Sequence, residues 1–265
     1  MSKIKNIVKV MNIHSLLRVD KSRKVADQFL VTENELTNLI DQIYFNENLI
    51  LDKKVISPNP NGIVLNIYIA NDLGFCGNFN SQVISALRKD KESNKVIIGK
   101  KINFDVDICL LKIEKEQFEE YINEINSIIY DMLLNKKIKE INIIYNHYHN
   151  INNFEFMCKK LFPVKLVSES IGKHDFVIES DINNLFVKLI TLYICYEIEM
   201  LEKNSFAAEN IMRQRITNES LKKIEEIEVE KFLKTRKEKK AKQVKKQLSD
   251  YRIIDKRWEK WLVKL

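Results

Sequence analysis

The feature that most constrains the fold is a long C-terminal segment without any helix-breaking residue. From Asp181 to Leu265 the sequence contains neither glycine nor proline, and the whole chain of 265 residues has only five Gly and three Pro. Because these two residues interrupt helices most strongly, the segment predicts one very long helix. Some 80 helical residues would span roughly 120 Å. No single domain of this size needs such a length, so we expect the helix to reach into a larger assembly.

Apolar residues recur at spacings of three and four, or a sum of these, in both terminal segments, which is typical of helices with one narrow apolar face. In the N-terminal segment they are Val25, Phe29, Leu36, Ile40 and Ile43, with Ile4, Ile7 and Met11 starting a similar stripe. In the C-terminal segment they are Leu185, Leu189, Leu192 and Tyr196, followed by Ala241, Val244, Leu248, Tyr251, Ile254, Trp258, Trp261 and Leu265. Neither segment has a core of its own, so we expect the two to pair as an antiparallel coiled coil.

The middle of the chain alternates between strand-like and helix-like patterns. Strands rich in β-branched residues are predicted at 63–70, 95–99, 106–113 and 140–145, and helices at 81–89 and 114–135. The segment 57–62 contains two prolines and a glycine and ends the first helix. The fold class is therefore α/β: a Rossmann-like domain over 63–180, a coiled-coil helix over 1–56 and another over 181–265.

Basic residues gather on both terminal helices, and the formal net charge is +7. Residues 231–246 alone hold nine Lys or Arg and one Glu. Such faces suit an acidic protein surface, nucleic acid or anionic lipid. A basic helical hairpin that binds nucleic acid is the alternative function, although the chain lacks interleaved aromatic residues and a known reader motif.

Cysteine usage and hydropathy indicate a soluble protein of a reducing compartment. The four cysteines form no CxxC pair and are expected to be free, buried thiols. The N-terminus does not resemble a signal peptide. The most apolar run, 190–200, is too short to span a bilayer and contains Glu197. Any attachment to a membrane is therefore expected to go through partners.

One loop stands where nucleotide-binding folds hold phosphate, between a strand and a helix. It reads Asn71-Asp72-Leu73-Gly74-Phe75-Cys76-Gly77-Asn78-Phe79-Asn80. Two glycines are present, but the pattern is neither GxGxxG nor GK[ST]. This favours a structural turn with Asn80 or Ser81 as N-cap, and leaves a nucleotide-using enzyme as a second alternative.

Other chemistry has weaker support. Cys76 could serve as a nucleophile near a helix start, but no histidine lies close to it in sequence, and a small buried residue is the preferred interpretation. His147 and His149 form an HxH pair that could join His174 at a metal ion; surface histidines are the preferred interpretation. We therefore expect no catalytic residue, cofactor or metal.

Several motifs, in the right order along the chain, resemble the gamma subunit of F-type ATP synthases. The loop 71–80 is similar to that family's T/S-D-R-G-L-C-G-G-F-N turn. Ile98–Lys101 is similar to its I-G-R-K-G, Ile143–Asn146 to its L-V-Y-N, and Ile178–Asp181 to its Y-E-P-D. Glu202–Ala208 is similar to its E-N-K-A-S-E-H-A-A run, with Thr217 at a later family threonine, and Ile4–Ile7 to its I-K-x-I opening.

The chain departs from the family at some positions. Leu73 replaces an arginine and Asn78 a glycine of the turn. Near the end, Arg236 is in register with a family arginine, but lysines replace its small and amidic neighbours. A divergent copy of this kind resembles those that mollicutes carry for gliding or surface-protein machinery.

The resemblance implies a non-catalytic rotor of an F-type-like rotary ATPase, which couples ATP hydrolysis or synthesis to rotation and, in a synthase, to proton transport. Its implied partners are alpha- and beta-type subunits of the catalytic head and other stalk subunits, with no membrane insertion of its own. Its implied place is cytoplasmic, at the inner face of the membrane. The motif residues are Asp72, Gly74, Cys76, Gly77, Phe79 and Asn80. The expected rotor contacts are Lys5, Lys9, Arg18, Lys21, Arg23, Lys24, Arg236, Lys239, Lys240 and Lys242.

Overall fold

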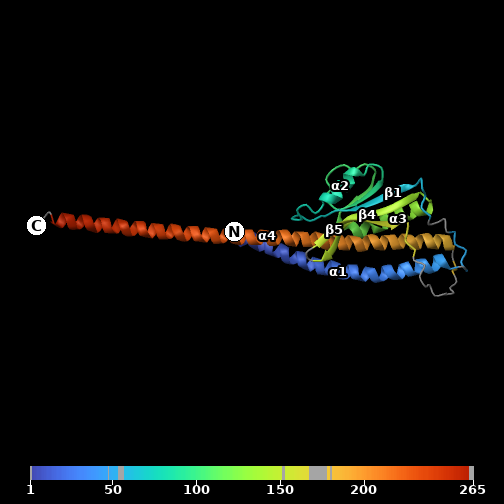
Figure 1. Cartoon of the computed structure of the whole chain (residues 1–265), viewed down its shortest axis with the longest axis horizontal. Coiled ribbons are helices and arrows are strands. Elements are labelled where there is room, and N and C mark those ends of the chain that lie inside the picture. The colour runs from blue at the N-terminus through green and yellow to red at the C-terminus, as the bar shows by residue number, and fades with distance from the viewer. Residues whose placement is uncertain are drawn as a thin grey trace. The chain divides into compact units, whose positions relative to one another are not determined.

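The computed structural model describes residues 2–46, 48–52, 57–150, 153–166, 178–179 and 181–262, with the side chains of residues 2 and 253–262 left out. Figure 1 shows its elements. In chain order they are α1 (Ser2–Phe45), β1 (Ile63–Ile69), α2 (Ser81–Lys89), β2 (Asn94–Ile98), β3 (Cys109–Ile113), the 3-10 helix η2 (Lys115–Gln117), α3 (Phe118–Leu134), β4 (Ile138–Asn150), β5 (Asn153–Phe162) and α4 (Ile182–Leu262).

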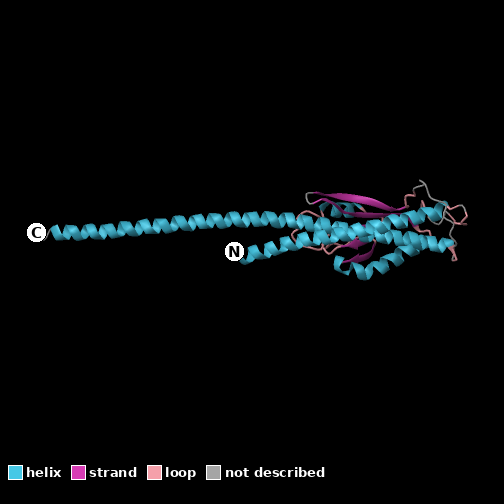
Figure 2. Ribbon diagram, turned by 90° about the horizontal axis from the view of Figure 1, so that it is seen from below, coloured by secondary structure: helices cyan, strands magenta, loops and turns pink. Residues whose placement is uncertain are grey.

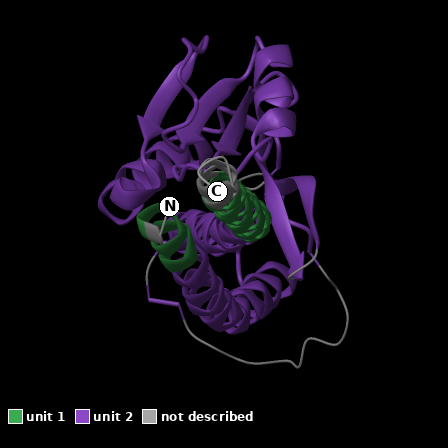
Figure 3. Ribbon diagram, turned by 90° about the vertical axis from the view of Figure 1, so that its left-hand side faces the viewer, with its two compact units in different colours: residues 1–10, 217–265 green, residues 11–216 purple. Residues whose placement is uncertain are grey.

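The chain divides into two compact units, which Figure 3 colours separately. The larger one, residues 11–216, contains the sheet, the short helices and most of α1. The smaller one joins residues 1–10 to residues 217–265. Both α1 and α4 contribute to each unit.

A five-stranded sheet in the order β3-β2-β1-β4-β5 forms the centre of the larger unit. Its first four strands are parallel, and β5 runs antiparallel to β4. Parallel strands must be joined by crossovers, and α2 and α3 supply two of these between β1 and β2 and between β3 and β4. The sheet is thus the Rossmann-like α/β arrangement expected from the sequence, extended by one antiparallel hairpin.

Alternation along the strands gives each face of the sheet its own core. Leu65, Ile67 and Ile69 of β1 lie in the large cluster that includes side chains of α1, α3 and α4. Tyr68 belongs to the opposite cluster, under α2. Because neighbouring strand residues point to opposite faces, one β-branched run can fill both cores. The helices α1 and α4 therefore cover the face of the sheet that α3 also covers.

Within the larger unit, α1 and α4 lie side by side and antiparallel (Figures 1 and 2). The Nδ2 of Asn12 donates to the backbone oxygen of Gln214 at 3.0 Å. Further along α1, the ring of Phe29 meets that of Tyr196 edge-on at 5.6 Å. Contacts at higher residue numbers on α1 thus meet lower residue numbers on α4, which confirms the antiparallel pairing predicted from the sequence. In the smaller unit, Lys5 pairs with Glu228 at 2.9 Å.

The apolar stripe predicted for the start of α1 was wrong. Ile4 and Ile7 are each about 60% exposed, and the side chains buried on the first half of the helix include Asn12, Ser15 and Val19. Small polar residues fit this face because backbone carbonyls accept from them: the Ser15 hydroxyl donates to the carbonyl of Met11, within α1, at 2.9 Å, and Asn12 donates to that of Gln214, on α4. The later part of the predicted stripe is confirmed at Ile40 and Ile43, which are buried.

The first stripe predicted for α4 is confirmed at Leu189, which packs against the core, and at Tyr196, which meets Phe29 of α1, but not at its other two members. Leu185 and Leu192 are exposed, whereas Phe186, Val187, Ile190, Ile194, Ile198 and Leu201 are buried. Up to about residue 216 this helix contacts both α1 and the sheet, so most of its circumference is covered and a single stripe does not describe it.

The second α4 stripe, predicted as a coiled-coil seam, shows no burial where it is described. Val244, Leu248 and Tyr251 are each more than half exposed. The side chains of Ile254, Trp258, Trp261 and Leu265, which continue it, lie outside the described residues.

Several boundaries differ from those expected. Helix α1 ends at Phe45 rather than near residue 56, and the strand expected at 140–145 extends over Ile138–Asn150. Strand β5 had no prediction, because Asn153–Phe162 is a half-exposed edge strand that mixes aromatic residues with lysines. Cys109 and Cys158 are exposed, against the expectation of buried thiols, while Cys76 and Cys195 are buried. No helix in the described part of the chain is long and apolar enough to cross a bilayer.

Candidate functional site

The motif turn 71–80 leaves the carboxyl end of β1 and packs against α4. Its anchor on α4 is Glu209, whose side chain is fully buried. The Oε1 of Glu209 accepts hydrogen bonds from the backbone N–H of Leu73 at 2.7 Å and of Asp72 at 3.1 Å. The Oε2 of the same carboxylate pairs with the Nζ of Lys115 at 3.0 Å. One side chain of α4 thus binds both the turn and the start of η2.

Lys115 completes this contact from the end of β3. Its side chain is only 4% exposed. Burial alone lowers its pKa, but the charges of Glu209, Glu202 and Asp72 and the hydrogen bond to Glu209 outweigh burial and raise the pKa. The ammonium is therefore held in its charged form. We call Glu209, Lys115 and Asp72 the α4 joint.

Asp72 ties the turn to the neighbouring strands. Its Oδ1 accepts from the N–H of Lys100, after β2, at 2.6 Å. Its Oδ2 accepts from the N–H of Lys115, after β3, at 2.8 Å. The carboxylate therefore joins the segments that follow β1, β2 and β3, at the carboxyl ends of these strands. Each of these bonds is charge-assisted, the stronger class of protein hydrogen bond.

The far end of the turn is fixed by asparagines. Asn80 lies at the N-cap position of α2, as predicted, but its side chain does not cap the helix. Instead its Oδ1 accepts from the N–H of Asn71 at 3.1 Å, and its Nδ2 donates to the Oδ1 of Asn71. The Nδ2 of Asn146, on β4, donates to the carbonyl of Phe79 at 2.9 Å. These bonds close the turn into a compact unit on the sheet.

Gly77 and Cys76 bring the turn close to α4. Gly77 has a φ of +53°, which L-residues rarely adopt, and a Cβ there would lie 3.0 Å from the Cδ1 of Ile216. Cys76 and Phe79 are buried with Ala207, Ala208 and Ile211 of α4. Burial, reinforced by the charge of Glu209, raises the pKa of the Cys76 thiol to about 11. That environment suppresses the thiolate and supports the packing role over the nucleophile.

The geometry of the turn differs from that of a phosphate loop. A phosphate loop offers free backbone N–H groups to an anion. Here the N–H groups of Asp72 and Leu73 already donate to Glu209. The Glu209 carboxylate therefore occupies the position that a bound phosphate would take. What this arrangement can do is mechanical: it fixes the sheet to α4 through two buried charges and several hydrogen bonds.

Sequence reasoning did not find Glu209 and Lys115. The quoted motif run ends at Ala208, one residue before Glu209, and Lys115 follows a strand without a recognisable pattern. The one signal in the sequence was that Glu209 follows two alanines in a helix. That pattern does not show whether the glutamate is buried unless its partner is known.

The predicted rotor contacts lie apart from this joint. Lys5 is half-buried and paired with Glu225 and Glu228, at 3.4 and 2.9 Å. All the others are exposed, namely Lys9, Arg18, Lys21, Arg23, Lys24, Arg236, Lys239, Lys240 and Lys242. Arg23 also stands over the ring of Tyr148, 5.6 Å from its centre.

The histidine pair is close but has other partners. The rings of His147 and His149 are 4.7 Å apart, the Nδ1 of His147 meets the hydroxyl of Tyr145 at 3.1 Å, and His149 meets Glu155 at 3.1 Å. His174 lies outside the described residues. Across the part of the chain that the structure describes, no three His, Cys, Asp or Glu side chains are grouped to hold a metal.

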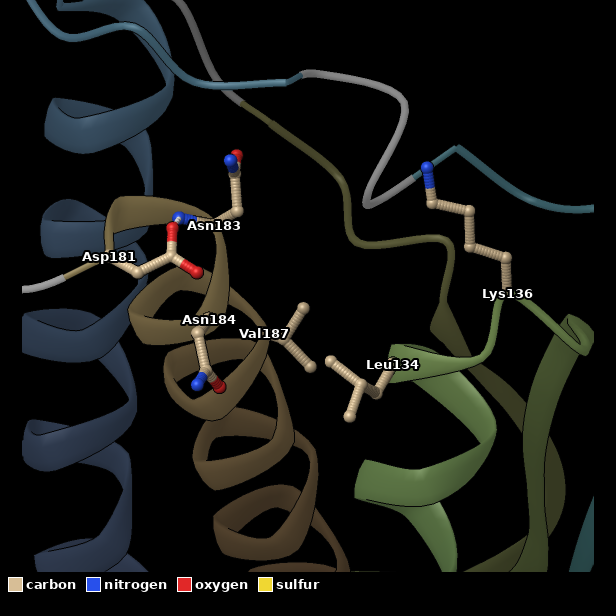
Figure 4. Close-up of a pocket in the computed structure, with 6 residues that line it drawn as sticks. All are labelled: Leu134, Lys136, Asp181, Asn183, Asn184 and Val187. Carbon is tan, nitrogen blue, oxygen red and sulfur yellow. Dashed lines mark hydrogen bonds between the residues drawn. The ribbon is translucent and has the colours of Figure 1, made fainter.

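A small pocket of about 160 Å³ opens at the start of α4 (Figure 4). Leu134 and Val187 line its apolar side. Its polar groups already have partners: Asn183 N–H donates to Asp181 at 3.1 Å, and the Tyr130 hydroxyl donates to Asn184 at 2.7 Å. The pocket therefore offers few free groups to a ligand.

The comparisons with known proteins agree with the motifs. Residues 1–250 match the model of the family described as "ATP synthase". The ATP synthase gamma chain of Clostridium perfringens SM101 is 27% identical over 247 residues, 84% of each chain. That of Mycoplasma capricolum is 27% identical over 209 residues, 73% of each chain.

A solved structure has the same fold. The matched chain comes from the central stalk and c-ring of the Tetrahymena thermophila mitochondrial ATP synthase. It aligns with a TM-score of 0.57 at 17% identity, over 81% of this chain and 99% of that one. The two curated relatives named above are gamma chains, and because the family match covers most of the sequence, the chain belongs to the ATP synthase family.

Proposed function

We propose that this chain is the non-catalytic central stalk of an F-type-like rotary ATPase, coupling ATP hydrolysis or synthesis in the catalytic head to rotation. The family membership supports this role. The observation that carries it is the α4 joint, in which the buried Glu209 binds the turn and Lys115 at once. A stalk must pass torque between its helices and its α/β domain, and a buried, charge-assisted joint resists slippage between them.

The partners we propose are the alpha- and beta-type subunits of the catalytic head, together with other stalk subunits. The exposed basic residues of α1 and α4 would meet acidic surfaces of that head. Exposed ion pairs are worth only about 0–1 kcal/mol each, so such contacts can form and break as the stalk turns. The motif turn, in this proposal, faces inward as a structural element rather than outward as a contact.

We propose further that the motor is a repurposed one, serving gliding or surface-protein machinery rather than a proton-coupled ring. The support is the change of sequence near the end of α4, where exposed lysines surround Arg236. Its place would be cytoplasmic, at the inner face of the membrane and attached through other subunits. Purifying the native complex and identifying its subunits tests this: a proton-channel ring in it would contradict the repurposed motor.

The basic contacts can be tested by charge reversal in the reconstituted complex. Changing Lys239, Lys240 and Lys242 together to Glu should slow ATP hydrolysis by the complex. The matched control changes three exposed lysines of the α/β domain, Lys91, Lys101 and Lys137, to Glu. An equal effect of both triple variants would contradict the proposed contact, as would unchanged hydrolysis and torque in the first.

A test of the non-catalytic role uses the isolated chain. With Mg²⁺ and ATP it should show no turnover above buffer controls, because its turn has no phosphate-binding lysine and its N–H groups at Asp72 and Leu73 are taken. Turnover that co-purifies with the folded chain would overturn the role.

A further inference from the structure

Three elements of the larger unit meet at a second buried ionic contact. Glu33 of α1, Glu197 of α4 and Lys159 of β5 form it. The Nζ of Lys159 lies 2.9 Å from Oε1 and 2.8 Å from Oε2 of Glu197, and 3.8 Å from Oε1 of Glu33. We call these residues the three-element clamp. It is separate from the α4 joint, and no catalytic or binding role assigned above uses it.

The clamp has two carboxylates for one ammonium. The Glu197 side chain is fully buried and that of Glu33 is only 16% exposed, while Lys159 is 37% exposed. With both acids ionised, one negative charge is left without a partner in a poorly solvated place. Such a pair favours holding one proton, because two like charges close together cannot both ionise cheaply.

In the part of the chain that the structure describes, Lys159 is the cation whose charge acts on Glu33. From α4, the Tyr193 hydroxyl donates to Oε1 of Glu197 at 3.2 Å. From β4, Tyr145 and His147 also face the clamp. Burial, followed by the charges of His149 and Lys159, lowers the pKa of His147 and so favours its neutral form. Burial, followed by the charge of Glu197, raises the pKa of Tyr145 and keeps its hydroxyl protonated. Tyrosine hydroxyls and a neutral imidazole carry no charge, so the clamp still has two carboxylates and one ammonium.

We propose that the three-element clamp binds one proton between Glu33 and Glu197, and that this proton tightens α1 against α4 and β5. With the proton bound, the clamp is electrically balanced and the two helices are joined. When the proton leaves, the two carboxylates repel each other across the helix pair and the contact weakens. This inference does not depend on the proposed stalk function.

The direction of the pH effect follows from the environment of Glu33. Burial, followed by the hydrogen bond and charge of Glu197, raises the pKa of Glu33 from 4.5 to about 7, although Lys159 acts against this. Between these values the folded clamp keeps a proton that the opened one releases. The contribution of this proton to the stability of the clamp is therefore complete at pH 4.5 and below, and it is lost as the pH rises through about 7.

Hydrogen exchange on the full chain tests the proposal, with backbone amides of residues 30–37 and 194–201 as the local probe. After correction for intrinsic rates, protection should fall by up to about tenfold per pH unit as the pH rises between about 5 and 7, since opening is linked to one proton. Glu33→Gln, which is neutral at every pH, should abolish this dependence. The exposed Glu35 of the same helix gives the matched control, and Glu35→Gln should behave as the wild type.

Two further variants separate a shared proton from a local defect. Glu197→Gln should weaken the pH dependence without abolishing it, because it removes the charge beside Glu33 but leaves Glu33 buried. The double variant should behave like Glu33→Gln alone, because Glu33 is the group that holds the proton. Lys159→Met should move the transition to higher pH, since the charge that favours the ionised form is gone. Protection that is independent of pH in the wild type, or an unchanged dependence in Glu33→Gln, would overturn the proposal. So would a shift to lower pH in Lys159→Met.

Discussion

The α4 joint makes a quantitative prediction for Glu209→Gln. The carboxylate accepts from two backbone N–H groups and pairs with Lys115, all while fully buried. An amide has one accepting oxygen, so its NH₂ group must face either the turn's N–H groups or the ammonium. Hydrogen bonds to a charged group are worth about 1.5–3 kcal/mol each, and breaking a buried ion pair from one side costs about 3–5 kcal/mol. Loss of the two hydrogen bonds to the turn would therefore cost about 3–6 kcal/mol and loss of the ion pair about 3–5 kcal/mol, so the loss of stability should be at least about 3 kcal/mol.

The assay is a double-mutant cycle with Lys115→Met, followed by urea unfolding of each variant. Lys115→Met alone should cost a similar amount, because it leaves the Glu209 carboxylate buried without its cation. In the double variant the amide oxygen can accept from the turn while its NH₂ group faces a neutral thioether. The double variant should therefore be more stable than either single one. A loss below about 1 kcal/mol for Glu209→Gln, or fully additive losses, would refute the joint.

Three further predictions follow from described contacts. Gly77→Ala should cost about 1–2 kcal/mol in urea unfolding because of its left-handed φ, whereas Gly74→Ala, with open space around it, should cost less. Burial would raise the pKa of Asp90, but hydrogen bonds from three side chains and one backbone N–H lower it to about 2. Asp90→Asn should therefore destabilise the chain at pH 7, and the difference from the wild type should shrink as the pH falls through about 2. A thiol reagent at neutral pH should label the native chain only at its exposed cysteines, Cys109 and Cys158, and should reach Cys76 and Cys195 only after unfolding; labelling of all four in the native state would contradict this.

The sequence predicted those parts of the fold that depend on local chemistry. The absence of Gly and Pro predicted the continuous α4, and the β-branched run at Ile63 predicted a buried strand. The bounds of α2 were predicted correctly, because an amphipathic pattern follows a turn of glycine and asparagine. Such signals need no knowledge of distant partners.

Features that depend on distant partners could not be predicted. The face of α1 against α4 carries Asn12 and Ser15, which a search for apolar stripes passes over. The α4 joint pairs Glu209 with Lys115 across 94 positions of sequence, and nothing in either neighbourhood marks it. The same holds for the three-element clamp, whose members come from α1, β5 and α4. Residue types alone do not show which charges are buried together.

The single helix α4 has two halves with different tolerance of changes in length. A one-residue deletion rotates every later side chain by about 100° around the helix axis. Among residues 182–216 this would turn Phe186, Ile194 or Glu209 away from the groups they pack against. Among residues 231–252 every side chain is exposed, so the same deletion misplaces no packed contact. An insertion of seven residues there would add about 10.5 Å and restore nearly the original heading. As far as packing within the chain is concerned, this part of the helix therefore tolerates a change of length that its other half does not.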